Sequence, residues 1–156
     1  TPAFVFTEIV AGDGLTVTVM PKGAGCDNQS RLAMLSPGEG RKGIRRFVVE
    51  TVAASNGRAC PPLVVGVGVG GSFEMAPLLA KKALLQDLER EREGAVGELE
   101  DELKAEVNGL GLGAMGLGGT VTALAVPLMT AASHMASLPV AVDLSCHSLR
   151  SARATL

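Results

Sequence analysis

The sequence predicts an α+β fold in one domain, and three observations support this. The chain has 156 residues, of which 47% are hydrophobic, enough for one domain with its own core. Short β-branched runs occur near its start, middle and end, and segments with helical spacing of apolar residues lie between them. Strands and helices do not alternate regularly. We therefore expect mixed strands with packed helices rather than a doubly wound sheet.

The first third of the chain predicts a β-hairpin and then a helix. Two β-branched runs, residues 3–10 and 14–21, flank the turn-forming letters AGDG, which is typical of a hairpin. From residue 41 to 54, apolar positions recur at helical spacing. Asn56 and Gly57 follow this segment. Both residues are suited to ending a helix, so we expect the helix to end there.

The rest of the chain predicts three strands and two helices. Cys60 and two prolines favour an extended approach into the first of these strands. In chain order we expect a strand (63–69), a helix that Ser72 caps (73–92), a polar helix (95–107), a loop with six glycines (109–119) and two strands (120–128 and 138–145).

The composition argues against several classes of function. The net charge is −2, and the chain has four Phe and no Trp or Tyr, so it lacks the basic surface and aromatic platforms of nucleic-acid-binding proteins. Neither a signal peptide nor an apolar run of about eighteen residues is evident. Three cysteines favour a reducing compartment. We expect a cytoplasmic protein that binds neither nucleic acid nor membranes. Because the chain opens at Thr1 in a strand-like run, we also expect a piece of a longer polypeptide.

Residues Gly66–Gly71 match the pattern G-x-G-x-x-G of dinucleotide-binding loops. Asp87 lies about where a ribose-binding acid would be expected. It would, however, lie on the helix that follows the glycines, whereas such an acid belongs at the end of the next strand. A structural turn is the favoured interpretation. A nucleotide-binding oxidoreductase domain stays open as the alternative.

Five polar residues are candidates for chemistry. Cys60 and Cys146 each lie where a strand meets a loop, which suits a metal or a reactive thiol, although a single cysteine is most often a small buried hydrophobe. His134 lies in a loop of small residues, and Arg150 can bind a carboxylate through two hydrogen bonds. Lys22 precedes Gly-Ala-Gly, whose N–H groups can face an anion. An exposed histidine, a surface arginine and a plain turn are the alternatives.

Four segments, taken in order, resemble one family. They are MPKGAGCDNQSRLAML, ACPPLVVGVGVGGSFEMAPLLAKKALL, NGLGLGAMGLGGTVTALAV and ASHMASLPVAVDLSCHSLR. Together they resemble the α subunit, or N-terminal catalytic domain, of the class I fumarases and related L-tartrate dehydratases, over about residues 3–150. The resemblance implies an oxygen-sensitive hydro-lyase with a 4Fe–4S cluster. Such an enzyme reversibly dehydrates a 2-hydroxy-dicarboxylate, malate or tartrate.

The resemblance also implies roles for single residues. Cys60, in the Cys-Pro-Pro motif, and Cys146 would be two of the three cluster ligands, and His134 would be a catalytic contact to the substrate. The family's first ligand stands in an upstream Cys-Gln-Asp-Thr-Gly motif that this chain lacks, and Cys26 is the second choice for that place. Substrate binding would fall to Lys22, Gly23, Ala24, Gly25 and Arg150, with Ala24 departing from the family's glycine.

The resemblance further implies a β subunit or β domain that supplies the base and other carboxylate-binding groups. We therefore expect an oligomer, homomeric or heteromeric, and no dehydration by this chain alone. A non-catalytic assembly subunit is the remaining alternative. In the fold, Cys60 and Cys146 should approach one another, with His134 lining the same cavity. The glycine run after Cys60 should let the backbone close around the cluster.

Overall fold

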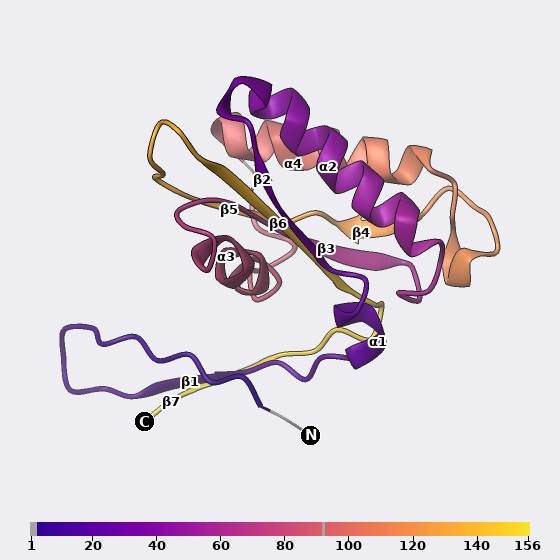
Figure 1. The fold of residues 1–156 in the computed structure, drawn as a ribbon. Coiled ribbons are helices and arrows are strands. Elements are labelled where there is room, and N and C mark those ends of the chain that lie inside the picture. Colours follow the sequence, from indigo (N-terminus) through magenta and orange to yellow (C-terminus); the bar gives the residue numbers. More distant parts are fainter. Residues whose placement is uncertain (1–2, 92) are drawn as a thin grey trace.

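A five-stranded sheet with helices on both faces forms the centre of the molecule (Figure 1). The structure is a computed structural model that describes residues 3–91 and 93–156. Helix α3 (Met75–Ala83) covers one face of the sheet, and helices α2 (Gly40–Ser55) and α4 (Gly94–Gly109) cover the other. A separate two-stranded ribbon lies on the α3 side of this body, where Lys82 of α3 pairs with Glu8. The predicted α+β class is confirmed.

The order and direction of the strands decide which loops meet. The described strands are β1 (Thr16–Val19), β2 (Arg31–Leu35), β3 (Leu63–Gly70), β4 (Ala123–Ala125), β5 (Leu128–Ala131), β6 (Leu138–Ser145) and β7 (Ala152–Thr155). The main sheet runs β2-β6-β3-β4, and β5 also pairs with β3. Strand β6 is antiparallel to β2 and β3, and Val64 pairs with Ser145. The loop before β3 and the loop after β6 therefore meet at one end of the sheet. The turn between β5 and β6 lies at the opposite end.

Two long helices were predicted near their observed positions. Helix α2 ends where Asn56 adopts a left-handed conformation with φ 44°, as the Asn-Gly pair predicted. Helix α4 matches the predicted polar helix. Two short 3₁₀ turns (Pro37–Glu39 and Ala114–Gly116) and the one-turn helix α1 (Ala24–Asp27) complete the helical segments described. Within the described residues, no helix is both long and apolar enough to cross a membrane.

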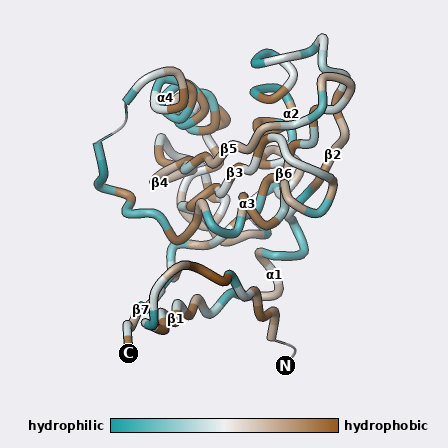
Figure 2. The backbone as a smooth tube through the Cα atoms, turned by 90° about the vertical axis from the view of Figure 1, so that its left-hand side faces the viewer, coloured by the Kyte–Doolittle hydropathy of each residue, from teal (hydrophilic) through white to brown (hydrophobic). Residues whose placement is uncertain are grey.

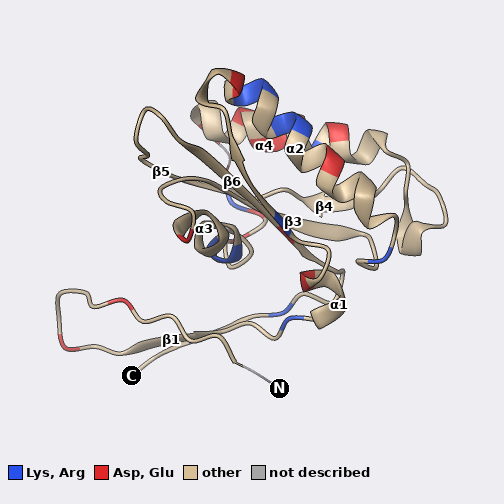
Figure 3. Cartoon of the chain, viewed as in Figure 1, with Lys and Arg blue, Asp and Glu red and all other residues tan. Residues whose placement is uncertain are grey.

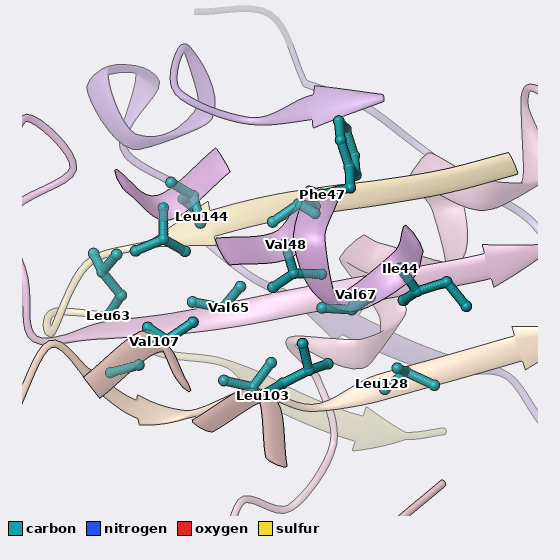
Figure 4. Packing of buried hydrophobic residues seen from close by; sticks show 14 of the residues in the cluster. Ile44, Phe47, Val48, Leu63, Val65, Val67, Leu103, Val107, Leu128 and Leu144 are labelled. Atoms are coloured by element: carbon teal, nitrogen blue, oxygen red, sulfur yellow. The ribbon is translucent and has the colours of Figure 1, made fainter. Parts of the chain in front are cut away.

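The main core lies between the sheet and the α2–α4 layer. Val65 and Val67 of β3 point to this side, because alternate residues of a strand face the same way. Figure 4 shows them beside Val48 of α2 and Leu103 of α4. These four side chains are fully buried. Burying a Val or Leu side chain contributes roughly 1.5–3 kcal/mol relative to leaving it exposed, so this layer supplies much of the stability.

The opposite face of β3 carries glycines, and they explain the G-x-G pattern. A Cβ atom on Gly66 would lie 2.3 Å from the Ala80 carbonyl oxygen, and one on Gly68 would lie 2.1 Å from that of Ala76. The glycines therefore let the backbone of α3 pack directly on the strand. The expectation that this run closes around a cluster is wrong, and the nucleotide-loop alternative fails for the same reason, because Gly66 and Gly68 lie within a strand covered by α3.

The predicted hairpin near the start of the chain is wrong. Residues 3–10 form no strand, and β1 pairs with β7 instead, with Thr16 opposite Thr155. The predicted helix over 73–92 is also too long, since α3 ends at Ala83. Turns follow it, and the Asp87 carboxylate accepts a hydrogen bond from the Glu89 N–H at 3.0 Å, an arrangement that competes with helix.

Residues 3–20, together with β7, form a ribbon that we call the arm, and its first part is strongly apolar (Figure 2). Large hydrophobic side chains of the arm are exposed. They are Phe4, Val5, Phe6, Ile9, Val10, Leu15, Val17 and Val19.

Candidate functional site

Three segments that are distant in sequence converge at one end of the sheet, which we call the cysteine end. They are α1 with Cys26, the loop that carries Cys60 ahead of β3, and the segment after β6 that begins with Cys146. The Cys26 thiol donates to the Ala59 carbonyl at 3.3 Å. The His147 ring nitrogen Nδ1 lies 3.4 Å from the Cys60 carbonyl oxygen. The segments that carry Cys60 and Cys146 therefore lie side by side, while the approach of the two thiols to each other stays a prediction.

The Cys60 loop has an unusual backbone that its neighbours hold in place. Cys60 has φ 54°, a left-handed conformation that is uncommon for a residue with a side chain. The N–H of Met115, in the second glycine-rich loop, donates to the Pro61 carbonyl at 2.8 Å. A Cβ atom on Gly57 would lie 2.9 Å from the Cα atom of Gly116, so the two loops touch through backbone alone. It is thus the glycine run at 109–119, not the one at 66–71, that packs against the Cys60 loop.

The thiols of Cys146 and Cys26 have opposite acid–base character. A hydrogen bond from Ser148, 2.9 Å from the Cys146 sulfur, is the main reason that the pKa of Cys146 is lowered. Burial is the main reason that the pKa of Cys26 is raised, and its contact with Cys146 adds to the effect. Cys146 is therefore the better thiolate, and Cys26 keeps its proton more readily.

Thiolates are the ligands that iron–sulfur clusters require, so Cys60 and Cys146 have the right chemistry for such a group. All three cysteines are free. Across residues 3–91 and 93–156, however, no three His, Cys, Asp or Glu side chains are arranged to hold a metal ion. The donor chemistry fits a cluster, but these described residues do not contain a complete set of three ligands arranged around it.

A buried cluster of charges lies beside α1. The Lys22 ammonium is 2.7 Å from the Leu144 carbonyl oxygen, 2.8 Å from Asp143 and 3.2 Å from Asp27. Its side chain is only 10% exposed, and that of Asp143 is 6% exposed. An ammonium has three N–H donors, and three acceptors surround this one. The side chain of Lys22 is thus fully engaged within the protein.

Helix α3 contributes a second cation to the same cluster. Lys81 lies 2.9 Å from Asp27 and 3.1 Å from Asp143. Burial acts to raise the pKa of Asp27, but hydrogen bonds and charge from Lys81 and Lys22 outweigh it and lower that pKa. Burial likewise acts to lower the pKa of Lys81, and its contacts with Asp27 and Asp143 outweigh this and raise it. All these shifts favour the charged forms.

This charged cluster borders a hollow on the α3 side of the sheet. The hollow has a volume of about 240 Å³, and Asp27, Ser30, Lys81 and Asp143 are among the residues that line it. These charges are more buried than most of those on α2 and α4, many of which lie on the outer surface of the molecule (Figure 3). Arg41, for example, pairs with Glu102 at 2.9 Å with both side chains about two-fifths exposed.

His134 lies at the other end of the sheet. It is exposed in the turn between β5 and β6, where its Nδ1 accepts a hydrogen bond from the Ala136 N–H at 3.2 Å. The eight residues of β6 separate it from the segment of Cys146, a span of roughly 25 Å at about 3.3 Å per residue. The prediction that His134 lines the same cavity as the two cysteines is wrong for this chain by itself.

Arg150 does lie near the cysteine end, four residues after Cys146. Its side chain is exposed and donates to the neighbouring Leu149 carbonyl at 2.7 Å. Of the other predicted binding residues, Gly23, Ala24 and Gly25 form the start of α1 and the turn before it. The structure therefore brings the Lys22–Cys26 segment, Cys60, Cys146 and Arg150 to one end of the sheet.

Asp143, Lys81 and Ser30 complete the charged cluster, and sequence reasoning missed all three. A signal was present for Asp143, since it is a single carboxylate in the apolar strand LPVAVDLS. A buried carboxylate needs partners, so its position predicted a nearby cation. Nothing in the sequence indicated which of the lysines would supply it.

Similar proteins come from archaea and bacteria. An archaeal relative in Methanocaldococcus jannaschii, described as a candidate L(+)-tartrate dehydratase subunit alpha, is 50% identical over 133 residues, which cover 85% of this chain and 47% of the relative. The L(+)-tartrate dehydratase subunit alpha of Escherichia coli K12 is 37% identical over 146 residues, covering 93% of this chain and 48% of the relative. The chain thus spans about half the length of these relatives.

A family model matches almost the whole chain. The family is described as Fumarate hydratase (Fumerase), and the match runs over residues 1–155. It includes the segments of all three cysteines, of Lys22 and of Arg150. The chain therefore belongs to the fumarate hydratase (Fumerase) family.

Proposed function

We propose that this chain is the cluster-binding part of a hydro-lyase that reversibly dehydrates a 2-hydroxy-dicarboxylate, malate or tartrate. The observation that carries the proposal is the convergence of the Cys60 loop, the Cys146 segment and the Lys22–Cys26 segment at one end of the sheet. Relatives named as L(+)-tartrate dehydratase alpha subunits support the class of reaction.

In this proposal Cys60 and Cys146 hold an iron–sulfur cluster of the 4Fe–4S type. When bound, the cluster would supply a Lewis-acidic iron for the departing hydroxyl group. The lowered pKa of Cys146 suits a ligand that must be a thiolate. Cys26 is the second choice for the third ligand, because its raised pKa favours the protonated thiol. A segment outside this chain is the first choice.

The other residues at this end bind and orient the substrate. The backbone of Gly23, Ala24 and Gly25 would face one carboxylate, and the exposed guanidinium of Arg150 would bind the other through paired hydrogen bonds. The Lys22 ammonium is engaged within the protein, so its contribution would be to hold this segment in place. His134 as a catalytic contact stays a prediction, and it would need a second chain or a rearrangement to reach this end.

A partner would supply the base and the remaining carboxylate-binding groups. Relatives are named as alpha subunits, which supports a β subunit. The exposed apolar side chains of the arm offer a surface for association in an oligomer. Free thiols and an oxygen-sensitive cluster suit a reducing, cytoplasmic compartment.

The test is to reconstitute this chain anaerobically with iron and sulfide, alone and within the complete enzyme containing its β subunit. We expect bound iron, bound sulfide and dehydration of malate or tartrate only in the complete enzyme. A complete enzyme with a cluster but no dehydration of either substrate would favour the assembly-subunit alternative. Turnover by the isolated chain would contradict the proposed need for a partner.

A further inference from the structure

Asp143 is a buried carboxylate on β6, and its oxygens are engaged from three directions. Its Oδ1 accepts from the Ser30 hydroxyl at 2.9 Å and lies 2.8 Å from the Lys22 ammonium. Its Oδ2 lies 3.1 Å from the Lys81 ammonium. A carboxylate that is 6% exposed is stable in its charged form only with such partners. The residue directly before β2, helix α3 and the segment before α1 therefore all contact one side chain of β6.

Lys22, which Asp143 holds in place, in turn positions the segment that follows it. Gly23, the next residue, accepts hydrogen bonds at its carbonyl from the Cys26 and Asp27 N–H groups, both at 3.1 Å. Fixing Lys22 therefore fixes the start of α1. The Lys22 ammonium also donates to the Leu144 carbonyl, two residues before Cys146. The segment expected to face the substrate is thereby held against the strand that ends at a proposed cluster ligand.

We propose that Asp143 is a positioning residue: through Lys22 it sets where the Gly23–Cys26 segment lies relative to the end of β6 that carries Cys146. This inference rests on the proposed function, since the segment matters for catalysis only if it binds the substrate there. Asp143 itself touches neither substrate nor cluster in this arrangement. Its effect reaches the site through Lys22.

A purely structural ion cluster would behave differently. Losing it would reduce the folded fraction, and hence kcat, but would leave KM unchanged, because the molecules that remain folded would bind substrate normally. Glu102 of α4 offers a matched control, since it also pairs with two cations, Arg41 at 2.9 Å and Arg45 at 3.4 Å, on the outer surface. Asp143→Asn and Glu102→Gln each remove one negative charge with almost no change of shape.

The first measurement is amide hydrogen exchange on the folded chain without cluster, which does not depend on the proposed function. In Asp143→Asn we expect residues 23–28 to exchange on the order of tenfold faster, because Lys22 loses its buried counter-charge and keeps only the Leu144 carbonyl and the half-exposed Asp27. Exchange in α2 should stay unchanged. Glu102→Gln should leave residues 23–28 at the wild-type rate. Unchanged exchange of residues 23–28 in folded Asp143→Asn would overturn the proposal.

The second measurement is the kinetics of the complete enzyme. We expect Asp143→Asn to raise KM for the dicarboxylate about tenfold while kcat changes less than about threefold, the pattern for lost binding rather than lost chemistry. Iron per chain should match the wild type. Wild-type KM in this variant would overturn the proposal. A wild-type enzyme without cluster or turnover would instead refute the proposed function. The exchange measurement would still test whether Asp143 positions residues 23–28.

Lys22→Met keeps the test decisive if Asp143→Asn does not fold. It removes the cationic half of the same tether and leaves Asp143 with Ser30 and Lys81. We expect the same faster exchange and the same raised KM as in Asp143→Asn. The double variant should show no larger effect on either quantity than each single variant, because both changes break the same connection. Folded Lys22→Met with wild-type exchange and wild-type KM would overturn the proposal.

Discussion

At the cysteine end of the sheet three segments from distant parts of the sequence meet, whereas at the other end one short connection joins β5 to β6, which both pair with β3. The first end contains the thiols and borders the buried charges of Lys22, Asp27, Lys81 and Asp143. The second contains His134 in an exposed turn whose hydrogen bonds are local. Both are ends of β6, but they are built from contacts of very different range.

Backbone strain shows the same contrast. Among the described residues, three that are not glycine have positive φ, namely Asn56, Cys60 and Met115. All three lie in the loops of the cysteine end. Such conformations are unfavourable by about 1–3 kcal/mol each and persist only where the surroundings fix them. The difference teaches that tertiary contacts fix the backbone more strongly at the cysteine end, which suits its proposed role in holding reacting groups in place.

The largest expected effect concerns iron binding at the cysteine end. In the complete enzyme, Cys60→Ser and Cys146→Ser should abolish bound iron and sulfide, because each removes a thiolate ligand. Cys26→Ser should retain both, since its protonated thiol is not a proposed ligand. Iron and sulfide analysis after anaerobic reconstitution measures this. Equal loss in Cys26→Ser would instead make the three cysteines the ligand set.

The next effect tests the opposite end. Gly70 has φ 89°, and a Cβ atom there would lie 2.0 Å from the Ala131 carbonyl oxygen. Gly70→Ala should lower the free energy of unfolding by about 2–4 kcal/mol, as overpacking and strain combine. Thermal denaturation measures the change. Gly109→Ala is the control, because a Cβ atom there meets nothing within 4 Å. If both variants were equally stable, the close packing of Gly70 against Ala131 would be refuted.

A smaller effect distinguishes two thiols within the cysteine end. In the chain without cluster, iodoacetamide should alkylate Cys146 on the order of tenfold faster than Cys26, because a lowered pKa gives more thiolate. Peptide mass spectrometry over a time course gives both rates. Ser148→Ala removes the main cause of the lowered pKa and should slow Cys146 selectively. Equal rates for the two cysteines would contradict the assignment of Cys146 as the better thiolate.

The smallest effect concerns stability in acid. The pKa of Asp27 is lowered in the folded protein, so its contribution is present above the unfolded value of about 3.9 and is lost as the pH falls through the folded pKa. Asp27→Asn should flatten this acid decline by less than about 1 kcal/mol, because the carboxylate is half exposed and screened. Urea denaturation between about pH 5 and pH 2 measures the slope. A folded Asp27→Asn variant with the wild-type slope would contradict the assignment.

Local patterns in the sequence predicted the long elements well. Helix α2 was recognisable because Ile44, Phe47, Val48 and Val52 share one face and Asn56 ends it. Strands β3 and β6 were recognisable as apolar runs bounded by breakers. The short strands β1 and β7 pair only with each other, from opposite ends of the sequence. Their pairing depends on long-range contacts that no local pattern encodes. The hairpin prediction therefore paired β1 with residues 3–10 instead of with β7.

The candidate site was predictable only in part. Motif resemblance selected Cys60, Cys146 and the Lys22–Gly25 segment, and strand order explains why they meet. Asp143 and Lys81 were missed because their pairing depends on how α3 lies across β6. His134 was misplaced because it is only twelve residues from Cys146 in sequence, yet an extended strand of eight residues separates their positions.

The pairing of β1 with β7 has a consequence for the order in which the molecule folds. The hydroxyl groups of Thr16 and Thr155 lie 3.0 Å apart although 139 positions separate them in the chain. Closing such a loop is slow and entropically unfavourable, and this closure forms only four residue pairs. A two-stranded ribbon of this size is marginal in water. We therefore expect the arm to form after the central sheet and to open first, so that a protease cleaves it earliest while the core stays folded.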